Sequence, residues 1–117
     1  GPEDISMVEC HDAFTIAEIL YYEALGFCKE GEAASFLRSG QAELGGKHVF
    51  SPRGGLLTMG HPLGATGVAQ AVEAVWQLRG EAGDRQIQGI KAAMTHITGG
   101  GVHGFDNAAC GIHIYTV

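Results

Sequence analysis

The chain has 117 residues, of which 45% are hydrophobic and 17% are charged, and this composition fits one modest globular domain. Its net charge of −6 argues against nucleic acid, which is bound by basic surfaces, and against an anionic membrane surface. Because no run of roughly 18 apolar residues occurs, no membrane-spanning helix is predicted.

The beginning of the chain predicts a strand followed by a helix. Residues 5–10 have a short strand pattern that mixes apolar and polar side chains. Residues 14–25 then carry apolar side chains at helical spacing, and Gly26 is placed to end that helix. Thr15 and Glu18 have the spacing of a capping box, so we expect a capped first turn.

The later elements alternate in the same way. We expect a short helix at residues 33–38, a strand at 47–50, a loop at 53–64 interrupted by a turn, and a helix from Ala65 to about Gly80. Valine and tryptophan side chains at positions 68, 72, 75 and 76 line one face of that helix. Two final strands, antiparallel to each other, are expected at residues 90–95 and 111–117.

The predicted order β-α-β-α-β-β indicates an α/β fold in which helices pack on a mixed sheet. No linker divides the chain, so we expect one domain at residues 3–117. Gly1 and Pro2 resemble the scar of a cleaved expression tag.

The three cysteines point to a reducing environment. Cys10, Cys28 and Cys110 are an odd number without CxxC spacing, so a disulfide framework is not expected. Cys110 begins the last predicted strand and is expected to be a small core residue. We expect a cytoplasmic location, or a peroxisomal one in a eukaryote.

Residues 60–67 are the most informative stretch for function. His61 lies there among glycines, where a loop meets the start of a helix. Free N–H groups at a helix start favour a neutral imidazole, which is the form that a general base needs. His96 is a second candidate, because it follows a buried type of strand and precedes three glycines. From spacing alone, a structural histidine at a turn or strand end explains each position equally well.

Residues 99–104 match GxGxxG formally, but no helix follows, so a dinucleotide site is rejected. We expect instead a tight loop whose N–H groups face a site, as in an oxyanion hole. The six histidines show no metal-ligand spacing, so no metal is predicted. A zinc site formed through the fold by His96, His103 and His113 is a less favoured alternative.

Residues 51–67 resemble the thiolase segment whose core is G-H-P-x-G-x-[ST]-G. Residues 11–14, with the sequence His-Asp-Ala-Phe, resemble the H-D-C-F loop of thiolases of the sterol carrier protein X type. Segments 22–26 and 75–83 look like the same branch. The resemblance covers nearly the whole chain and implies an incomplete C-terminal domain of the thiolase fold.

The resemblance implies a role for each of three histidines. His61 would activate a nucleophilic cysteine, His96 would be the acid/base at the α-carbon, and His11 would help to form an oxyanion hole. The substrate and oxyanion loops would include Phe14, Gly60, Gly99 and Gly100. Coenzyme A would be a substrate, no covalently bound cofactor is expected, and residues that bind a cofactor are not identified.

The departures from the family pattern define what is missing. The C-x-S loop of the N-terminal half, which carries the nucleophile, has no counterpart here, and neither has the first strand of the C-terminal half. Ser51 stands where members usually carry asparagine, and the loop at 99–107 is longer than usual. The favoured function is therefore the C-terminal part of an acyl-CoA thiolase, inactive as this piece alone.

Two alternatives remain open. One is a retro-aldol lyase that acts on steroid or other side-chain CoA thioesters with a small acyl-CoA-binding partner subunit. The longer loop at residues 99–107 is the feature that would indicate this alternative. Retention of His61 and His96 favours the thiolase. The other is a non-catalytic interaction module. The expected partners are acyl-CoA or coenzyme A, the missing N-terminal half and, in the full-length protein, further copies in a homodimer or higher oligomer.

Overall fold

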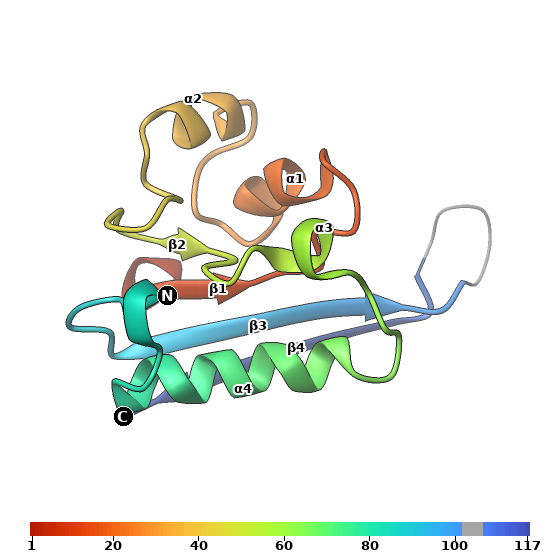
Figure 1. Cartoon of the computed structure of the whole chain (residues 1–117). Helices are drawn as coiled ribbons and strands as arrows, with labels where there is room; N and C mark the ends of the chain where they lie inside the picture. Colours follow the sequence, from red (N-terminus) through yellow and green to blue (C-terminus); the bar gives the residue numbers. More distant parts are fainter. Residues whose placement is uncertain (102–106) are drawn as a thin grey trace.

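The computed structural model describes residues 1–101 and 107–117 and contains a four-stranded sheet with helices on both faces (Figure 1). The strands are β1 (Met7–Glu9), β2 (Val49–Phe50), β3 (Ala92–Gly99) and β4 (Ala109–Thr116), in the spatial order β2-β1-β3-β4. β1 is parallel to β2 and β3, whereas β4 is antiparallel to β3. The predicted α/β class, the mixed sheet and the antiparallel last pair are therefore confirmed.

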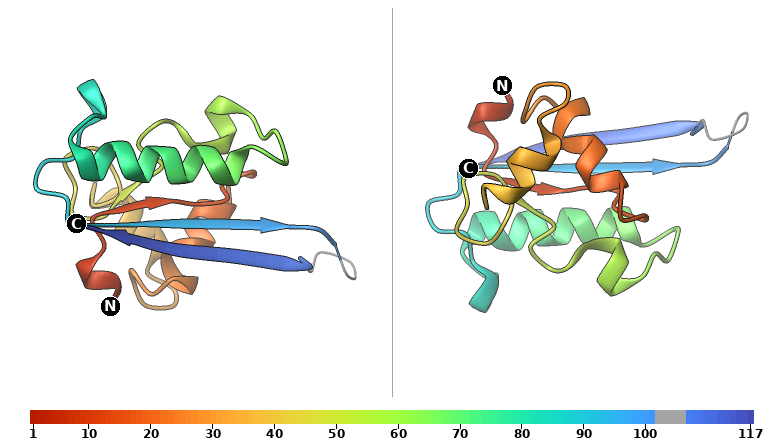
Figure 2. Two further views of the ribbon diagram at one scale, coloured as in Figure 1. Left: turned by 90° about the horizontal axis from the view of Figure 1, so that it is seen from below. Right: turned by 90° about the horizontal axis from the view of Figure 1, so that it is seen from above.

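Helices cover the sheet on two sides (Figure 2). α1 (Ala17–Ala24) and α2 (Ala33–Arg38) lie over one face, and α4 (Thr66–Arg79) lies along the other. Successive residues of a strand point to opposite faces, so Val8 packs with Tyr22 of α1 while Met7 packs with Ala74 of α4. Three short elements complete the fold: η1 (Pro2–Asp4), α3 (Gly55–Met59) and η2 (Gly83–Arg85).

The capping box predicted at the start of α1 is wrong. The residue that caps the helix is Ile16, and it makes no side-chain cap hydrogen bond. Glu18 instead accepts a hydrogen bond from the hydroxyl of Tyr22, one turn further along. Tyr22 is buried, so this bond satisfies a phenol that has no access to water. The predicted stop is confirmed, because Gly26 has a φ of 82° and a left-handed turn there ends the helix.

The loop predicted at residues 53–64 contains a helix, α3, so that part of the prediction is wrong. Gly54 and Gly55 have φ values of 104° and 63°, which side chains rarely adopt, and they turn the chain sharply into α3. The N–H of Leu56 then donates to Asp12 Oδ1 at 2.8 Å. The partner that satisfies this first turn comes from a distant segment, and local sequence patterns do not reveal it.

The apolar face of α4 points away from the sheet. Val68 is 64% exposed and Trp76 is 44% exposed, although both belong to the apolar stripe of the helix. Most of the buried positions are polar instead, and they include Gln70, Glu73 and Gln77. α4 packs on the sheet through Ala74, which contacts the cluster around Met7, and through the amide of Gln70, while its apolar stripe faces away from the sheet.

β4 lies at the edge of the sheet, and most of its residues are exposed. Cys110 is exposed as well, so its predicted place in the core is wrong. The reason is that no element covers this end of the edge strand among the described residues. Within residues 1–101 and 107–117, no helix has the length and apolar character needed to cross a membrane.

Candidate active site

Three histidines meet at one end of the sheet. His11 lies two residues after the end of β1, and His96 lies in β3, near its carboxyl end. Because β1 and β3 are parallel neighbours, their carboxyl ends lie side by side. The connection from α3 to α4 brings in His61, whose ring centroid is 4.7 Å from that of His11, with the two rings at 85°. The backbone N–H of His11 donates to His96 Nδ1 at 3.5 Å.

The hydrogen bonds around His61 accommodate the tautomer with the proton on Nδ1. Its Nδ1 lies 2.8 Å from Thr66 Oγ1, at the first residue of α4. The Thr66 hydroxyl donates its own hydrogen to the carbonyl of Pro62 at 3.2 Å. The hydroxyl has one hydrogen for these two acceptors, and when it donates to Pro62 its oxygen accepts from His61, with the proton on Nδ1. Nε2 of His61 is then left unprotonated, as a general base needs.

His11 has the complementary arrangement. Its Nδ1 accepts a hydrogen bond from the backbone N–H of Thr98 at 3.3 Å, so in the neutral ring the proton is on Nε2. An Nε2–H group can donate to a developing oxyanion. The pKa of His11 is lowered from its usual value, first by burial and then by the neighbouring His61, so the neutral ring is favoured.

His96 is almost fully buried and packs edge-on against Tyr21 of α1, with ring centroids 4.4 Å apart. Its pKa is also lowered, mainly by burial and secondly by His11. The strand was predicted to end at Thr95, but β3 continues to Gly99, so His96 lies within the strand and not after it. Its side chain shares a face with Met94 and points to the α1 side of the sheet.

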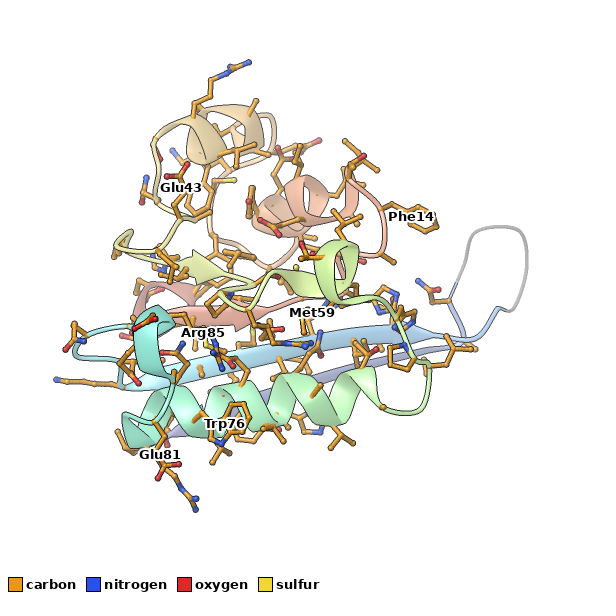
Figure 3. The ribbon with its side chains drawn as sticks, viewed as in Figure 1. Phe14, Glu43, Met59, Trp76, Glu81 and Arg85 are labelled. Atoms are coloured by element: carbon orange, nitrogen blue, oxygen red, sulfur yellow. The ribbon has the colours of Figure 1, made fainter. Side chains whose placement is uncertain are left out.

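The predicted loop residues lie in different environments. Phe14 is 73% exposed and projects outward ahead of α1 (Figure 3). The N–H of Gly60 donates to the carbonyl of Leu56, so it is already engaged. Gly99 pairs with Ala109 in the sheet, and Gly100 turns the chain with a φ of 71°. The rest of the predicted glycine loop, residues 102–106, lies outside the described residues.

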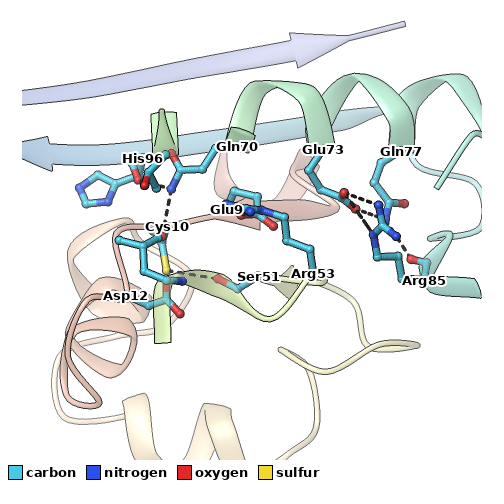
Figure 4. Close-up of polar contacts among 12 residues, drawn as sticks. Glu9, Cys10, Asp12, Ser51, Arg53, Gln70, Glu73, Gln77, Arg85 and His96 are labelled. Atoms are coloured by element: carbon cyan, nitrogen blue, oxygen red, sulfur yellow. Dashed lines mark hydrogen bonds and ion pairs between the residues drawn. The ribbon is translucent and has the colours of Figure 1, made fainter. Parts of the chain in front are cut away.

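Gln70 is a site residue that sequence patterns did not identify. It is fully buried in α4, and its amide donates to the carbonyls of Cys10 and His96 at 3.1 and 3.2 Å (Figure 4). One side chain thus joins the strand end before His11 to the strand that carries His96. A glutamine at a helical position gives no such signal in the sequence, because its partners are backbone atoms of distant strands.

Comparison with known proteins identifies the family. The sequence profile described as thiolase C-terminal domain-like matches residues 1–107. The chain belongs to this family. This thiolase domain is 57% identical over 102 residues to the benzoylsuccinyl-CoA thiolase subunit BbsB of Thauera aromatica, which covers 86% of the chain and 26% of that protein. It is 54% identical over 98 residues to sterol carrier protein 2 of Homo sapiens, covering 84% of the chain and 18% of that protein.

Two further relatives extend the comparison. Acetyl-CoA acetyltransferase of Methanothermobacter thermautotrophicus is 47% identical over 115 residues, or 98% of the chain and 29% of that protein. A solved structure described as the Ltp2-ChsH2(DUF35) aldolase has a TM-score of 0.73 at 30% identity, over 82% of the chain and 24% of that structure's chain. This thiolase domain therefore spans less than a third of the length of these relatives, and its resemblance to the sterol carrier branch is confirmed.

Cys10 and Cys28 are not activated as nucleophiles by their surroundings. Cys10 is fully buried, and burial raises the pKa of its thiol far above the ordinary value. Its Sγ lies 3.8 Å from the hydroxyl of Ser51. Burial and two nearby glutamates also raise the pKa of Cys28.

The zinc alternative includes His103, which lies outside the described residues. Among the residues that the structure does describe, no group of three His, Cys, Asp or Glu side chains is arranged to hold a metal ion.

Proposed function

We propose that this domain supplies the acid/base and oxyanion groups of a coenzyme A-dependent thiolase, whose nucleophilic cysteine lies in a part of the protein outside this chain. The observation that carries the proposal is the pair formed by His61 and His11. One ring offers an unprotonated Nε2 and the other offers an Nε2–H, and the two rings are in contact. A base beside an oxyanion donor is what acyl transfer to a cysteine needs.

The bond-forming direction uses the three histidines in their neutral forms. His61 Nε2 takes the proton of the cysteine thiol, the thiolate displaces coenzyme A from a first acyl-CoA, and the departing thiolate of coenzyme A takes up that proton. His96 then removes an α-proton from a second acyl-CoA through Nδ1, its unprotonated nitrogen, which gives up its long 3.5 Å contact with the His11 N–H. The oxygen of the resulting enolate accepts a hydrogen bond from His11. The enolate carbon attacks the acyl-cysteine carbonyl, the C–S bond breaks, and the released thiolate regains the proton held by His96. Cleavage is the reverse sequence.

The same reading explains what this domain does not contain. Cys10 and Cys28 are not activated thiols, and its net charge of −6 is poorly suited to holding the phosphates of coenzyme A. Both functions are therefore assigned to the part of the full-length protein outside this chain. In the relatives, more than two thirds of the sequence lies beyond the matched region.

A groove on the outer side of α4 is where we expect that remainder to pack. The groove has a volume of about 790 Å³ and is lined mainly by apolar residues of α4 and α3, including Val72, Trp76 and Met59 (Figure 3). Exposed apolar surface of this kind is typical of a protein interface. A homodimer or higher oligomer of the full-length protein, with β4 at an exposed sheet edge, remains part of the proposal.

Val72→Glu is expected to destabilise the full-length protein by at least about 2 kcal/mol, because the groove would then bury a carboxylate. The two arginines that line the groove, Arg53 and Arg85, are already paired with Glu9 and Glu73. Leu44→Glu is the matched control, since Leu44 is also exposed but does not line the groove. Thermal unfolding of both variants checks the prediction. A midpoint for Val72→Glu that matches Leu44→Glu would contradict packing of the remainder in this groove.

The function itself is tested by incubating the full-length protein with 3-oxoacyl-CoA substrates, including benzoylsuccinyl-CoA, with and without free coenzyme A. We expect two CoA thioesters as products, and only when coenzyme A is present. In the bond-forming direction, the rate should fall on the acid side with an apparent pKa below 6.5, because burial lowers the pKa of His11 and His96. An acid limb above that value would contradict the assignment of neutral histidines.

A second candidate is a retro-aldol lyase that works with a partner subunit. It is favoured by the 30% identity to the Ltp2-ChsH2(DUF35) aldolase, at a TM-score of 0.73. A retro-aldol cleavage consumes no coenzyme A and releases a carbonyl compound with one CoA thioester. Cleavage of a β-hydroxyacyl-CoA without added coenzyme A would therefore favour the lyase, and absence of both activities would favour a non-catalytic module.

A further inference from the structure

Asp12 joins the two segments that carry His11 and His61. It is almost fully buried, and its Oδ1 accepts the N–H of Leu56 at 2.8 Å. Leu56 lies in the first turn of α3, the helix that leads through Gly60 to His61. On the other side of the contact, Asp12 is the residue directly after His11. One side chain thus holds the His11 segment against the start of the segment that ends at His61.

Gly55 is shaped around the same carboxylate. A Cβ atom built on Gly55 would lie 1.9 Å from Asp12 Oδ2, and the residue has a φ of 63°. Only glycine lets the two backbones approach this closely without displacing the carboxylate. Both carboxylate oxygens are therefore placed against the Gly55–Leu56 turn, one by a hydrogen bond and the other by close packing.

We propose that Asp12 is a positioning residue: it fixes the distance between the rings of His11 and His61 by anchoring the His11 segment to the first turn of α3. The inference rests on the proposed function, because the ring contact matters for catalysis only if the two histidines act together. Asp12 itself acts through backbone position and transfers no proton. Misplacement of reacting groups by about 1 Å is enough to slow catalysis by about 100-fold.

The matched control is Glu23. Like Asp12, it has an acidic side chain that accepts backbone N–H groups at the start of a short helix. Its partners are the N–H of Gly31, just before α2, and the N–H of Ala33, the first residue of α2. α2 carries none of the three histidines. Glu23→Ala therefore removes a similar kind of anchor without touching the site.

In the full-length enzyme, Asp12→Ala is expected to lower kcat by about 10- to 100-fold with little change in KM. Asp12→Asn should keep most of the activity, because its amide oxygen can still accept the Leu56 N–H. Glu23→Ala should keep kcat within about twofold of the wild type. An equal loss in Glu23→Ala, or a loss in Asp12→Asn as large as in Asp12→Ala, would overturn the proposal.

A structural readout separates this inference from the proposed function. Hydrogen–deuterium exchange of the peptide that contains Leu56 should be faster in Asp12→Ala than in the wild type, and unchanged in Asp12→Asn. Unchanged exchange in Asp12→Ala would overturn the anchoring role whatever the activity. If exchange responds as expected while the wild type cleaves no 3-oxoacyl-CoA, the anchor stands and the proposed function fails.

Discussion

His61→Ala is expected to lower kcat of the full-length protein by about 10³-fold, with KM for the acyl-CoA nearly unchanged. The reason is the tautomer of His61. When the Thr66 hydroxyl donates to Pro62, its oxygen accepts a hydrogen bond from Nδ1–H of His61, and Nε2 is then free to take the proton of the cysteine. Alanine removes that base and leaves the oxyanion donor in place.

Two variants sharpen the test. Thr66→Val removes the oxygen that sets the tautomer but keeps the imidazole, so an intermediate loss of about tenfold is expected. His113→Ala is the control, because His113 is an exposed histidine on β4, and it should keep kcat within about twofold. Steady-state rates of CoA-dependent cleavage measure all three. Wild-type activity in His61→Ala would exclude His61 as the base for the nucleophile.

The motifs of the sequence predicted three histidines for the candidate site, but they did not define the geometry of those histidines. His11 and His96 are 85 residues apart, and their contact follows from the pairing of β1 with β3. Both strands could be predicted from the sequence, but their order in the sheet could not. The hydrogen-bond partners that set each tautomer, Thr66 and the N–H of Thr98, become visible only once the strands and α4 are placed.

The errors in the predicted elements have a common physical cause. The capping box at Thr15 has the right residues, yet Glu18 bonds Tyr22, because a buried phenol needs a partner more than an exposed helix start does. The helix α3 was missed because Asp12 supplies its first hydrogen bond from outside the local window. In both places a tertiary contact determines the local structure, and single-sequence patterns do not contain it.

α4 shows the same limit for a binding surface. Its apolar stripe was visible in the sequence, but a stripe alone does not say whether it faces the sheet or another part of the protein. In the structure another face of α4 lies on the sheet, where Gln70 donates to the carbonyls of Cys10 and His96 and Ala74 packs with Met7. The apolar stripe therefore faces outward. This agrees with the greater length of the relatives, because this chain matches only one part of them.

Arg53→Met is expected to destabilise the chain by about 3 kcal/mol at alkaline pH and by clearly less at acidic pH. Glu9 is completely buried in β1, and Arg53 Nε donates to its Oε2 at 2.9 Å, while Oε1 has no hydrogen-bond partner (Figure 4). Burial raises the pKa of Glu9 to about 7, and Arg53 opposes that rise. Methionine keeps much of the side-chain volume and removes the only cation paired with this carboxylate among the described residues.

The sign of the pH dependence follows from the proton balance. A carboxyl group with a raised pKa holds its proton in the folded state while the unfolded chain has already lost it, so stability from this group falls as pH rises above the ordinary glutamate value. In the wild type this fall ends near pH 7, where Glu9 ionises and pairs with Arg53. In Arg53→Met the pKa of Glu9 rises further, because the attraction that lowered it is gone. The fall in stability then continues to higher pH.

Urea unfolding at about pH 6 and about pH 8.5 measures this difference, with the larger loss expected at the higher pH. Arg53→Met combined with Glu9→Gln should regain most of the stability lost at high pH, since a neutral amide needs no cation. Equal losses at both pH values would contradict an ionised Glu9 above neutral pH.

The Glu9–Arg53 pair also lies close in sequence to the candidate site. Glu9 lies two residues before His11, and Arg53 lies between β2 and α3 on the segment that leads to His61. The Glu9–Arg53 pair thus links the same two segments that the Asp12–Leu56 contact links, at a second point.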